Sequence, residues 1–201
     1  MNFLAHLYLS FDDDAIMIGN FIADHVKGKT VNDFSDSIQK GIRLHRAIDA
    51  FTDSHSVVEE TRIRLRPEFR KYAPVISDIF YDHFLAAAWN DFSQTSLDQF
   101  AASFYSIANR HLHEMPQRTQ KMLPVMVQHD WLTSYRTIEG IGAVLTGMSR
   151  RTAFESRMEY AAAELTKNYD SYKKEFRVFF PELITFAKNK LEEITSAYSG
   201  E

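Results

Sequence analysis

The sequence predicts an all-α fold, in which one helical bundle forms a single domain over residues 1–201. Apolar residues recur at the period of an α-helix through most of the chain. The chain contains only 7 glycine and 5 proline residues, and turn-forming residues make short breaks between the helical segments. A chain of this length buries one continuous core, so no second domain is needed.

The segment 35–52 is the first long helical pattern. His45 and Asp49 fall on the face that also carries its apolar residues. A shorter helix near the N-terminus holds His6 on its apolar stripe, and residues 27–32 are expected to form a loop. Ionisable side chains therefore occupy positions where a helical core is normally apolar.

The segment 74–89 is the second long pattern. Pro74 lies in its first turn, where proline is favoured because its missing N–H would have no helical partner. One face carries Asp78 and Asp82 among apolar residues, and the opposite face is apolar as well. We therefore expect this helix to lie at the centre of the bundle.

The rest of the chain continues the helical pattern, with a loop expected at residues 91–95. One long helix is expected to open at Arg150 and to end before Pro181, because proline lacks the N–H that the helix needs. The remaining helices are predicted at 96–113, 116–128, 150–180 and 182–198.

Composition excludes several classes of function. The chain has no cysteine, which excludes disulfides and thiolate ligands and leaves histidine and carboxylates to bind Mn, Mg, Fe or Zn. The formal net charge of −4 disfavours general nucleic-acid binding. No stretch has the length of a transmembrane helix, and the N-terminal residues do not resemble a signal peptide. We expect a cytoplasmic protein that binds neither nucleic acid nor membrane.

The residues of ligand type suggest a metal centre. His45 and Asp49 lie one helical turn apart, about 6 Å between Cβ atoms, so both side chains can reach one ion. Asp53 follows a further turn along the same helix. Other segments supply more residues of the same type, namely Asp24, Asp78, Asp82 and His83. Buried charges are costly unless they are paired or bind metal, so this recurrence favours a buried hydrolytic metal centre.

Each of these residues also has a purely structural interpretation. An isolated His–Asp pair is most often a structural hydrogen bond in the core, and only the recurrence of such residues favours metal binding for His45 and Asp49. His6 is either a satisfied core residue or a ligand, and the sequence leaves both open.

Arginine residues fall into three groups: Arg62, Arg66 and Arg70; Arg150 and Arg151; Arg43 and Arg46. The first group recurs every four residues and makes a stripe on a helix that Pro67 bends or ends. The second group is expected to open a helix, where guanidinium groups and backbone amides together hold phosphate. A solvated helix face explains both groups equally well. The third group flanks His45 and is placed to bind a substrate phosphate or to neutralise a carboxylate.

Several of these segments also occur together in a known family. They are Met-Asn-Phe-Leu-Ala-His at 1–6, Gly-Asn-Phe-Ile-Ala-Asp at 19–24, Gly-Ile-Arg-Leu-His-Arg-Ala-Ile-Asp at 41–49 with Thr52 and Asp53, Asp-His-Phe-Leu at 82–85, and Gly147 and Met148 with Arg150 and Arg151. In these segments the sequence resembles the acyl carrier protein phosphodiesterase family, also called holo-acyl-carrier-protein hydrolases. The resemblance implies a fold related to the metal-dependent phosphohydrolases that are named for an adjacent His-Asp pair. In this sequence the candidate pair Asp82-His83 has the reverse order.

The resemblance also implies a reaction and a ligand set. The reaction is hydrolysis of the phosphodiester between 4′-phosphopantetheine and a serine of holo acyl carrier protein, with a divalent ion, Mn or Mg, that activates water. The metal role is assigned to Asp24, His45, Asp82 and His83, with His6, Asp49, Asp53 and Asp78 as further candidates. Arg43 or Arg46 would stabilise charge on the phosphoryl oxygens, and Asp49 would accept the proton from water.

The substrate implied in this way is itself a protein. Carrier proteins of this family's substrate class are strongly acidic, so docking is expected on a basic patch formed by Arg62, Arg66, Arg70, Arg150 and Arg151. Two other functions remain open. One is a hydrolase of nucleotides or other small phosphoesters on the same scaffold, and the other is a non-enzymatic helical module whose His and Asp residues only stabilise the interior.

Overall fold

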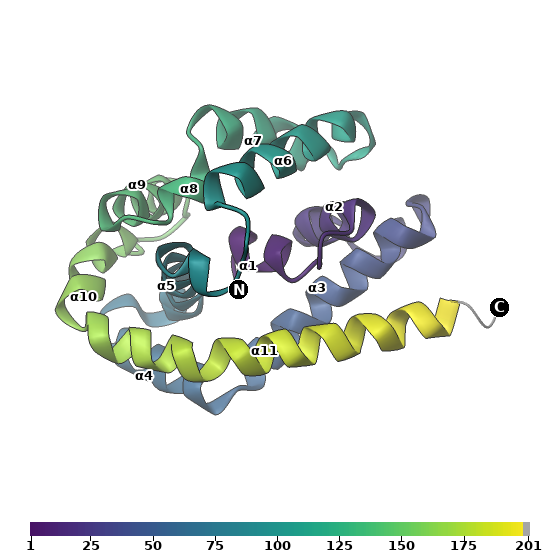
Figure 1. Ribbon diagram of the computed structural model, residues 1–201. Helices are drawn as coiled ribbons and strands as arrows, with labels where there is room; N and C mark the ends of the chain where they lie inside the picture. Colours follow the sequence, from purple (N-terminus) through teal and green to yellow (C-terminus); the bar gives the residue numbers. More distant parts are fainter. Residues whose placement is uncertain (199–201) are drawn as a thin grey trace.

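A computed structural model describes residues 1–198, and all the regular structure in this part of the chain is helical (Figure 1). The prediction of an all-α fold is confirmed. The α-helices are α1 (Phe3–Tyr8), α2 (Asp14–Ile22), α3 (Asp36–Ser54), α4 (Ser56–Phe69), α5 (Ala73–Ala87), α6 (Leu97–Arg110), α7 (Gln117–Gln128), α8 (Trp131–Ser134), α9 (Ile138–Ser149), α10 (Ala161–Lys167) and α11 (Tyr169–Tyr198). Short 3-10 helices are η1 (Ala23–His25), η2 (Gly28–Asp33), η3 (Arg70–Tyr72), η4 (Trp89–Asp91), η5 (Leu112–Glu114) and η6 (Met158–Tyr160).

Helices α3 and α5 form where the sequence predicts them. The Ser35 side chain accepts a hydrogen bond from the N–H of Ile38 and so caps α3. Pro74 lies in the first turn of α5. From Ile76 to Ala86 most side chains of α5 are buried, including both Asp82 and the apolar residues opposite it. The predicted central position of α5 is confirmed.

The C-terminal third differs from its prediction. Helix α9 ends at Ser149, an irregular connector follows, and the chain then forms η6, α10 and the 30-residue helix α11. Helix α11 passes through Pro181 instead of ending before it. A proline inside a helix costs about 3 kcal/mol. Phe179, Phe180 and Leu183 on either side are fully buried, and each contributes about 1.5–3 kcal/mol, which keeps the helix continuous.

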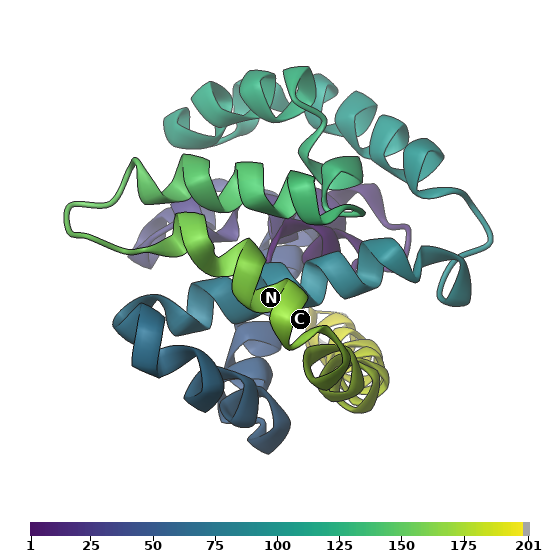
Figure 2. The same ribbon diagram turned by 90° about the vertical axis from the view of Figure 1, so that its left-hand side faces the viewer.

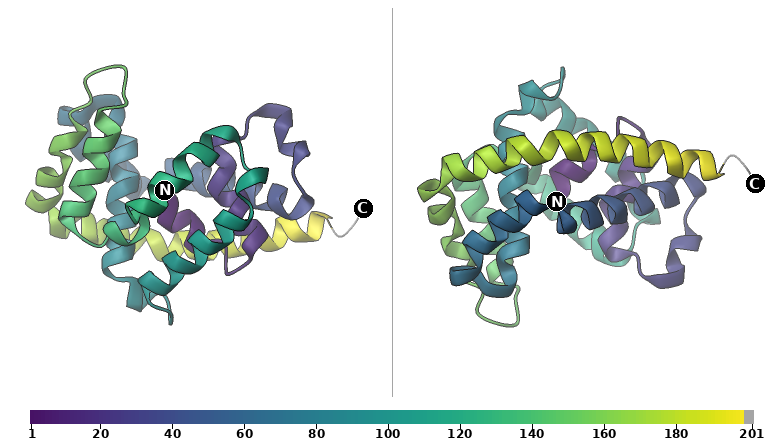
Figure 3. Two further views of the ribbon diagram at one scale, coloured as in Figure 1. Left: turned by 90° about the horizontal axis from the view of Figure 1, so that it is seen from above. Right: turned by 90° about the horizontal axis from the view of Figure 1, so that it is seen from below.

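Helix α11 is the long support of the fold. It runs along the molecule and packs on α3, α4 and α5 (Figures 1 and 3). Its contact with α5 is aromatic, with ring centroids 5.2 Å apart for Phe80 and Tyr172 and 5.8 Å apart for Phe84 and Phe176. Helices α6 and α7 cover the opposite side (Figure 1). Helices α1, α2 and α3, which carry the candidate ligands, lie between these two sides.

Helices α2 and α3 cross at two glycines. A methyl group on Gly19 would lie 2.1 Å from the carbonyl oxygen of Ile38, and one on Gly41 would lie 2.2 Å from that of Ile16. Atoms of the backbone cannot yield as a flexible side chain does, so only glycine allows this approach. The close crossing places the last turns of α2 directly beside the middle of α3.

Candidate metal centre

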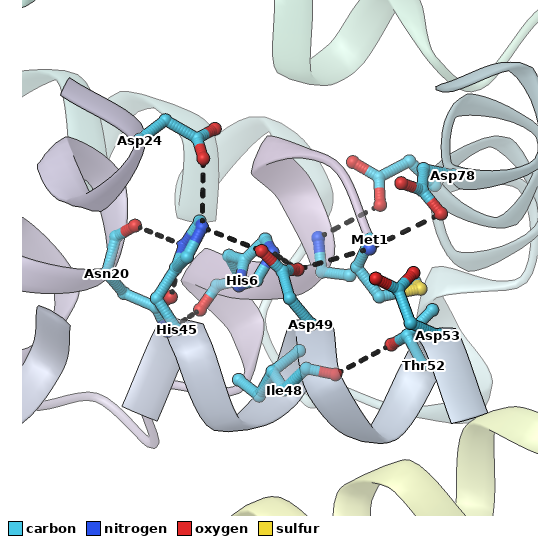
Figure 4. Close-up of polar contacts among 12 residues, drawn as sticks. Met1, His6, Asn20, Asp24, His45, Ile48, Asp49, Thr52, Asp53 and Asp78 are labelled. Atoms are coloured by element: carbon cyan, nitrogen blue, oxygen red, sulfur yellow. Dashed lines mark hydrogen bonds and ion pairs between the residues drawn. The ribbon is translucent and has the colours of Figure 1, made fainter. Parts of the chain in front are cut away.

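Three side chains from two helices converge in the interior (Figure 4). His6 comes from α1, and His45 and Asp49 come from successive turns of α3. Each of them offers one ligand atom to a group whose members all lie within 4.8 Å of one another. The Asp49 carboxylate lies 3.1 Å from Nε2 of His6 and 3.1 Å from Nε2 of His45.

The His45 ring is held in one orientation by α2. Its Nδ1 lies 2.9 Å from the main-chain oxygen of Asn20 and 3.2 Å from the side-chain oxygen of the same residue. Both atoms are acceptors, so Nδ1 donates, and Nε2 is the ring nitrogen that faces the carboxylates of the cluster. The Asn20 amide in turn donates to the His6 carbonyl at 2.6 Å. Asn20 therefore contacts the ring of His45 and the main chain of His6, and the two rings stack with centroids 3.9 Å apart.

Asp24 stands at the open side of the cluster. It lies in η1, directly after α2, and its Oδ1 is 3.3 Å from Nε2 of His45. Its side chain is 68 % exposed, whereas those of His6 and His45 are buried. Asp24 is therefore the carboxylate of this group that a molecule arriving from solvent meets first.

A second charged group lies behind the cluster. The buried amino nitrogen of Met1 is 3.6 Å from Oδ1 of Asp49 and 3.4 Å from Oδ1 of Asp78 (Figure 4). Asp78 is also 3.9 Å from the guanidinium of Arg62, which donates to Asp53 at 2.7 Å. Positive and negative groups thus alternate from the two histidines to the end of α3.

The pKa values of the ionisable groups in the cluster shift in opposite directions. Burial lowers the pKa of His45, but hydrogen bonds to Asp24 and Asp49 outweigh burial and raise it to about 9. Burial, and then the charge of His45, lower the pKa of His6 to about 4. Burial opposes ionisation of Asp49, yet its bonds to both histidines hold its pKa well below the usual range. At neutral pH the cluster therefore holds an ionised Asp49, a protonated His45 and a neutral His6.

These residues fit a divalent cation. Nδ1 of His6 is buried and makes no hydrogen bond, and Nε2 of His45 is buried between the carboxylates of Asp24 and Asp49. Buried polar atoms without a partner cost about 1–3 kcal/mol each. Two imidazoles and a carboxylate are a donor set that Mn, Fe and Zn accept, and an ion at this position would replace the proton that His45 holds between two carboxylates. The carboxylate of Asp24 lies close enough to add a further oxygen.

Asp82 and His83 lie outside this cluster, contrary to the ligand assignment from the sequence. The Asp82 carboxylate accepts from the N–H of Leu4 at 2.7 Å and of Ala5 at 3.3 Å, so it caps the start of α1. Burial raises the pKa of Asp82 to about 7.

His83 is held by two tyrosines. Its Nδ1 lies 2.8 Å from the main-chain oxygen of Tyr135, and its Nε2 lies 3.2 Å from the hydroxyl of Tyr169. The side chains of Asp82 and His83 therefore make hydrogen bonds to other parts of the core and do not contact the cluster.

The exposed arginine stripe expected on α4 is not formed by all three residues. Arg62 is buried and reaches the Asp53 carboxylate, so both residues serve an ion pair beside the cluster. Arg66 is exposed and pairs with Glu59 at 2.7 Å. Arg70 lies beyond α4, directly after its last residue Phe69, because the helix continues through Pro67 for two more residues.

The other arginines are placed as follows. Arg150 and Arg151 follow the C-terminal end of α9. The prediction that they open a helix and form a phosphate site at its N-terminus is therefore wrong. Arg46 donates to the carbonyl of Val26, which keeps its guanidinium near the segment that follows Asp24. Arg43 lies on the exposed side of α3.

Comparison with known proteins assigns the chain to a family. The sequence profile of the acyl carrier protein phosphodiesterase family matches residues 1–183. The chain belongs to the acyl carrier protein phosphodiesterase family. The acyl carrier protein phosphodiesterase of Photorhabdus laumondii is 34 % identical over 191 residues, which cover 94 % of this chain and 96 % of that protein. The proteins of the same name from Enterobacter sp. and Klebsiella pneumoniae are also 34 % identical, over 94 % of this chain and 99 % of their own lengths.

No solved structure matches the chain. The relationship to the metal-dependent phosphohydrolases that are named for an adjacent His-Asp pair therefore stays a prediction. Within residues 1–198, no helix has both the length and the apolar character needed to cross a membrane.

Sequence reasoning missed two features of the site, Asn20 and the Met1 amine, and one His-Asp pair outside it. Asn20 lies inside one of the matching segments, which was the available signal for it. The Met1 amino group carries no side-chain signal at all. An adjacent His-Asp pair also exists at His129-Asp130, but both residues are exposed at the end of α7, and Asp130 accepts from the hydroxyl of Tyr105 at 3.1 Å.

Proposed function

We propose that this protein hydrolyses the phosphodiester between 4′-phosphopantetheine and the serine of holo acyl carrier protein, and that it uses a divalent cation held by His6, His45 and Asp49. Of the two ions expected from the sequence, Mn or Mg, the two imidazoles favour Mn. The single observation that supports the chemistry is the convergence of these three residues, whose ligand atoms all lie within 4.8 Å of one another. The names of the family and of its curated members support the substrate. When a cation is bound there, Lewis-acid chemistry becomes available to the phosphodiester and to water.

The protein's own residues orient this chemistry. Asn20 keeps Nδ1 of His45 protonated, so Nε2 faces the cluster as a donor of electrons. The amino group of Met1 lies behind Asp49 and neutralises part of its charge. The carboxylate of Asp49 contacts both histidines and this amine, so few of its acceptor positions remain for a proton from water.

Asp24 is better placed than Asp49 to accept a proton. Its carboxylate is exposed to solvent and lies 3.3 Å from Nε2 of His45. The bond to His45 is the largest cause that lowers the pKa of Asp24, so it is ionised at neutral pH. Arg46, which donates to the carbonyl of Val26 near Asp24, and Arg43 remain the candidates for stabilising charge on the phosphoryl oxygens, as proposed from the sequence.

The test is conversion of holo acyl carrier protein, followed by its intact mass. Purified protein is incubated with the substrate and Mn²⁺, Mg²⁺ or chelator. We expect metal-dependent loss of the mass of 4′-phosphopantetheine. Well-folded, metal-loaded protein that leaves the mass unchanged would contradict the proposal.

A parallel panel separates the two rival functions. Hydrolysis of free nucleotides in preference to the holo carrier protein would assign the site to small phosphoesters. Protein that binds no metal and hydrolyses neither class would instead support a helical module whose buried polar residues are structural.

A further inference from the structure

Basic and aromatic side chains gather on one surface outside the metal centre. The connector between α9 and α10 projects from the fold (Figure 2) and lies against η3, which joins α4 to α5 (Figure 3). We call this surface the basic–aromatic face and define it as residues 68–72 and 150–160. The two segments are about 80 residues apart in the sequence and meet through Lys71 and Phe154.

Phe154 is exposed and yet held in place. Its side chain is 68 % exposed, the highest value among the large apolar side chains of the described residues. Its carbonyl oxygen accepts from the hydroxyls of Tyr72 at 3.3 Å and Thr152 at 2.7 Å, and Nζ of Lys71 lies 4.2 Å from the centre of its ring. Tyr160 in the same face is 56 % exposed. Exposed aromatic residues on a fixed backbone are typical of interaction sites, because little entropy is lost when a partner covers them.

The charge of this face is opposite to that of the whole protein. The face contains five basic residues and three acidic residues, a balance of +2, whereas the chain carries −4. Glu68 is neutralised by Arg157 at 3.1 Å. Arg70 and Arg150 are exposed and have no acidic partner among residues 1–198. The remaining positive charges on the face are Lys71 and Arg151.

Helix α5 connects the face to the charged group behind the metal centre. Helix α5 begins directly after Tyr72, and its second turn carries Asp78, which contacts the Met1 amine. Seven residues separate Lys71 from Asp78, roughly 10 Å along a helix at 1.5 Å per residue. A partner on the face would therefore lie nearest to the side of the cluster that Met1 and Asp78 occupy, whereas the exposed Asp24 lies on its other side (Figure 4).

We propose that the basic–aromatic face is the docking site for the acidic carrier protein, with Phe154 inserted among apolar residues of the partner and Lys71, Arg150 and Arg151 facing its carboxylates. This inference rests on the proposed function for the name of its partner. The face itself selects an acidic protein surface that offers an apolar depression, because charge complementarity steers such a partner and the aromatic side chain supplies the desolvated anchor.

The test uses two variants of the full chain and two matched controls. Arg150→Glu/Arg151→Glu reverses charge on the face, and Phe154→Ala removes the anchor. Lys188→Glu and Val178→Ala make the same kinds of change at exposed positions of α11 outside the face. KM and kcat are measured with holo acyl carrier protein, and the affinity for the apo form is measured by calorimetry.

We expect KM to rise at least tenfold in the charge-reversal variant and at least fivefold in Phe154→Ala, with kcat within about twofold of the parent. The two control variants should match the parent. Unchanged KM and unchanged affinity for the apo form in both face variants would overturn the proposal, as would an equal effect of Lys188→Glu. If the parent fails to convert the holo form, the proposed function fails, and weaker binding of the apo form by the face variants would still support the docking site.

Discussion

The imidazole rings of His6 and His45 stack with their centroids 3.9 Å apart and their planes 15° apart, and only one of the two rings is protonated at neutral pH. Both rings contact the same carboxylate, Asp49. His45 also contacts Asp24, whereas His6 is fully surrounded by the core and repelled by its charged neighbour. One positive charge is therefore shared between two carboxylates, in the position where a cation would bind.

Metal binding should release a proton, because His45 must lose it to become a ligand. With a pKa of about 9 for His45 in the metal-free protein, the apparent affinity for Mn²⁺ should rise about tenfold per pH unit between pH 6 and 8. His6, with a pKa of about 4, and the ionised Asp49 add nothing in this window. Calorimetry in buffers of different ionisation enthalpy measures the proton count. An affinity that does not vary with pH would contradict this prediction.

Metal binding should depend on His45 and not on His83, although both are buried histidines. His45→Ala should lose bound metal and lower kcat/KM by more than about 100-fold, since it removes a ligand. His83→Ala leaves Tyr135 and Tyr169 without their partner and should lower stability by about 1–3 kcal/mol with metal retained. Metal per folded protein is measured by mass spectrometry. Equal metal loss in both variants would restore His83 as a ligand.

Charge on the Met1 amine should stabilise the fold through Asp78. One glycine added before Met1 replaces the amine with a neutral peptide nitrogen next to two carboxylates, which should lower the free energy of unfolding by about 3 kcal/mol. In an Asp78→Asn background the same addition should cost clearly less, because one of the two carboxylates is absent. Urea denaturation of the four proteins measures the coupling. Equal losses in both backgrounds would show that Asp78 and the amine do not interact.

The crossing of α2 and α3 should tolerate no side chain. Gly41→Ala brings a methyl group against the backbone of Ile16 and should cost about 2–3 kcal/mol or more. Gly147→Ala in α9 meets no atom within 4 Å and should stabilise the protein by about 0.5–1 kcal/mol, because alanine favours the helix. Denaturant unfolding of the two variants gives both values. A Gly41→Ala variant as stable as the parent would show that the helices can separate without cost.

The sequence predicted the helices that follow a clear apolar period, and it failed where burial overrides a local signal. Helix α3 has a capping serine and an amphipathic face of its own, and α5 has a proline in its first turn and a clear apolar period. Pro181 predicted the end of a helix, yet the aromatic residues beside it bury enough apolar surface to keep α11 continuous. A local rule about proline cannot include packing against helices that are distant in the sequence.

The candidate site was predicted in part. His45 and Asp49 were identified because they lie one helical turn apart, Asp24 because a further segment supplies the same type of residue, and His6 because it interrupts an apolar stripe. Asp82 has the same residue type and spacing, but its carboxylate caps α1, a role that only the relative position of two helices reveals. The Met1 amine has no signal in the pattern of side chains, since its position depends on how α1 packs.

The five residues of the cluster and its orienting shell, His6, Asn20, Asp24, His45 and Asp49, all come from the first quarter of the chain. Contacts between segments so close in the sequence need little loop closure, so α1 to α3 can assemble their polar centre early in folding. The docking face, in contrast, joins residues 68–72 to 150–160 and depends on the assembled bundle. Partner preference can therefore diverge through the later segments while the chemistry encoded at the start of the chain is left intact.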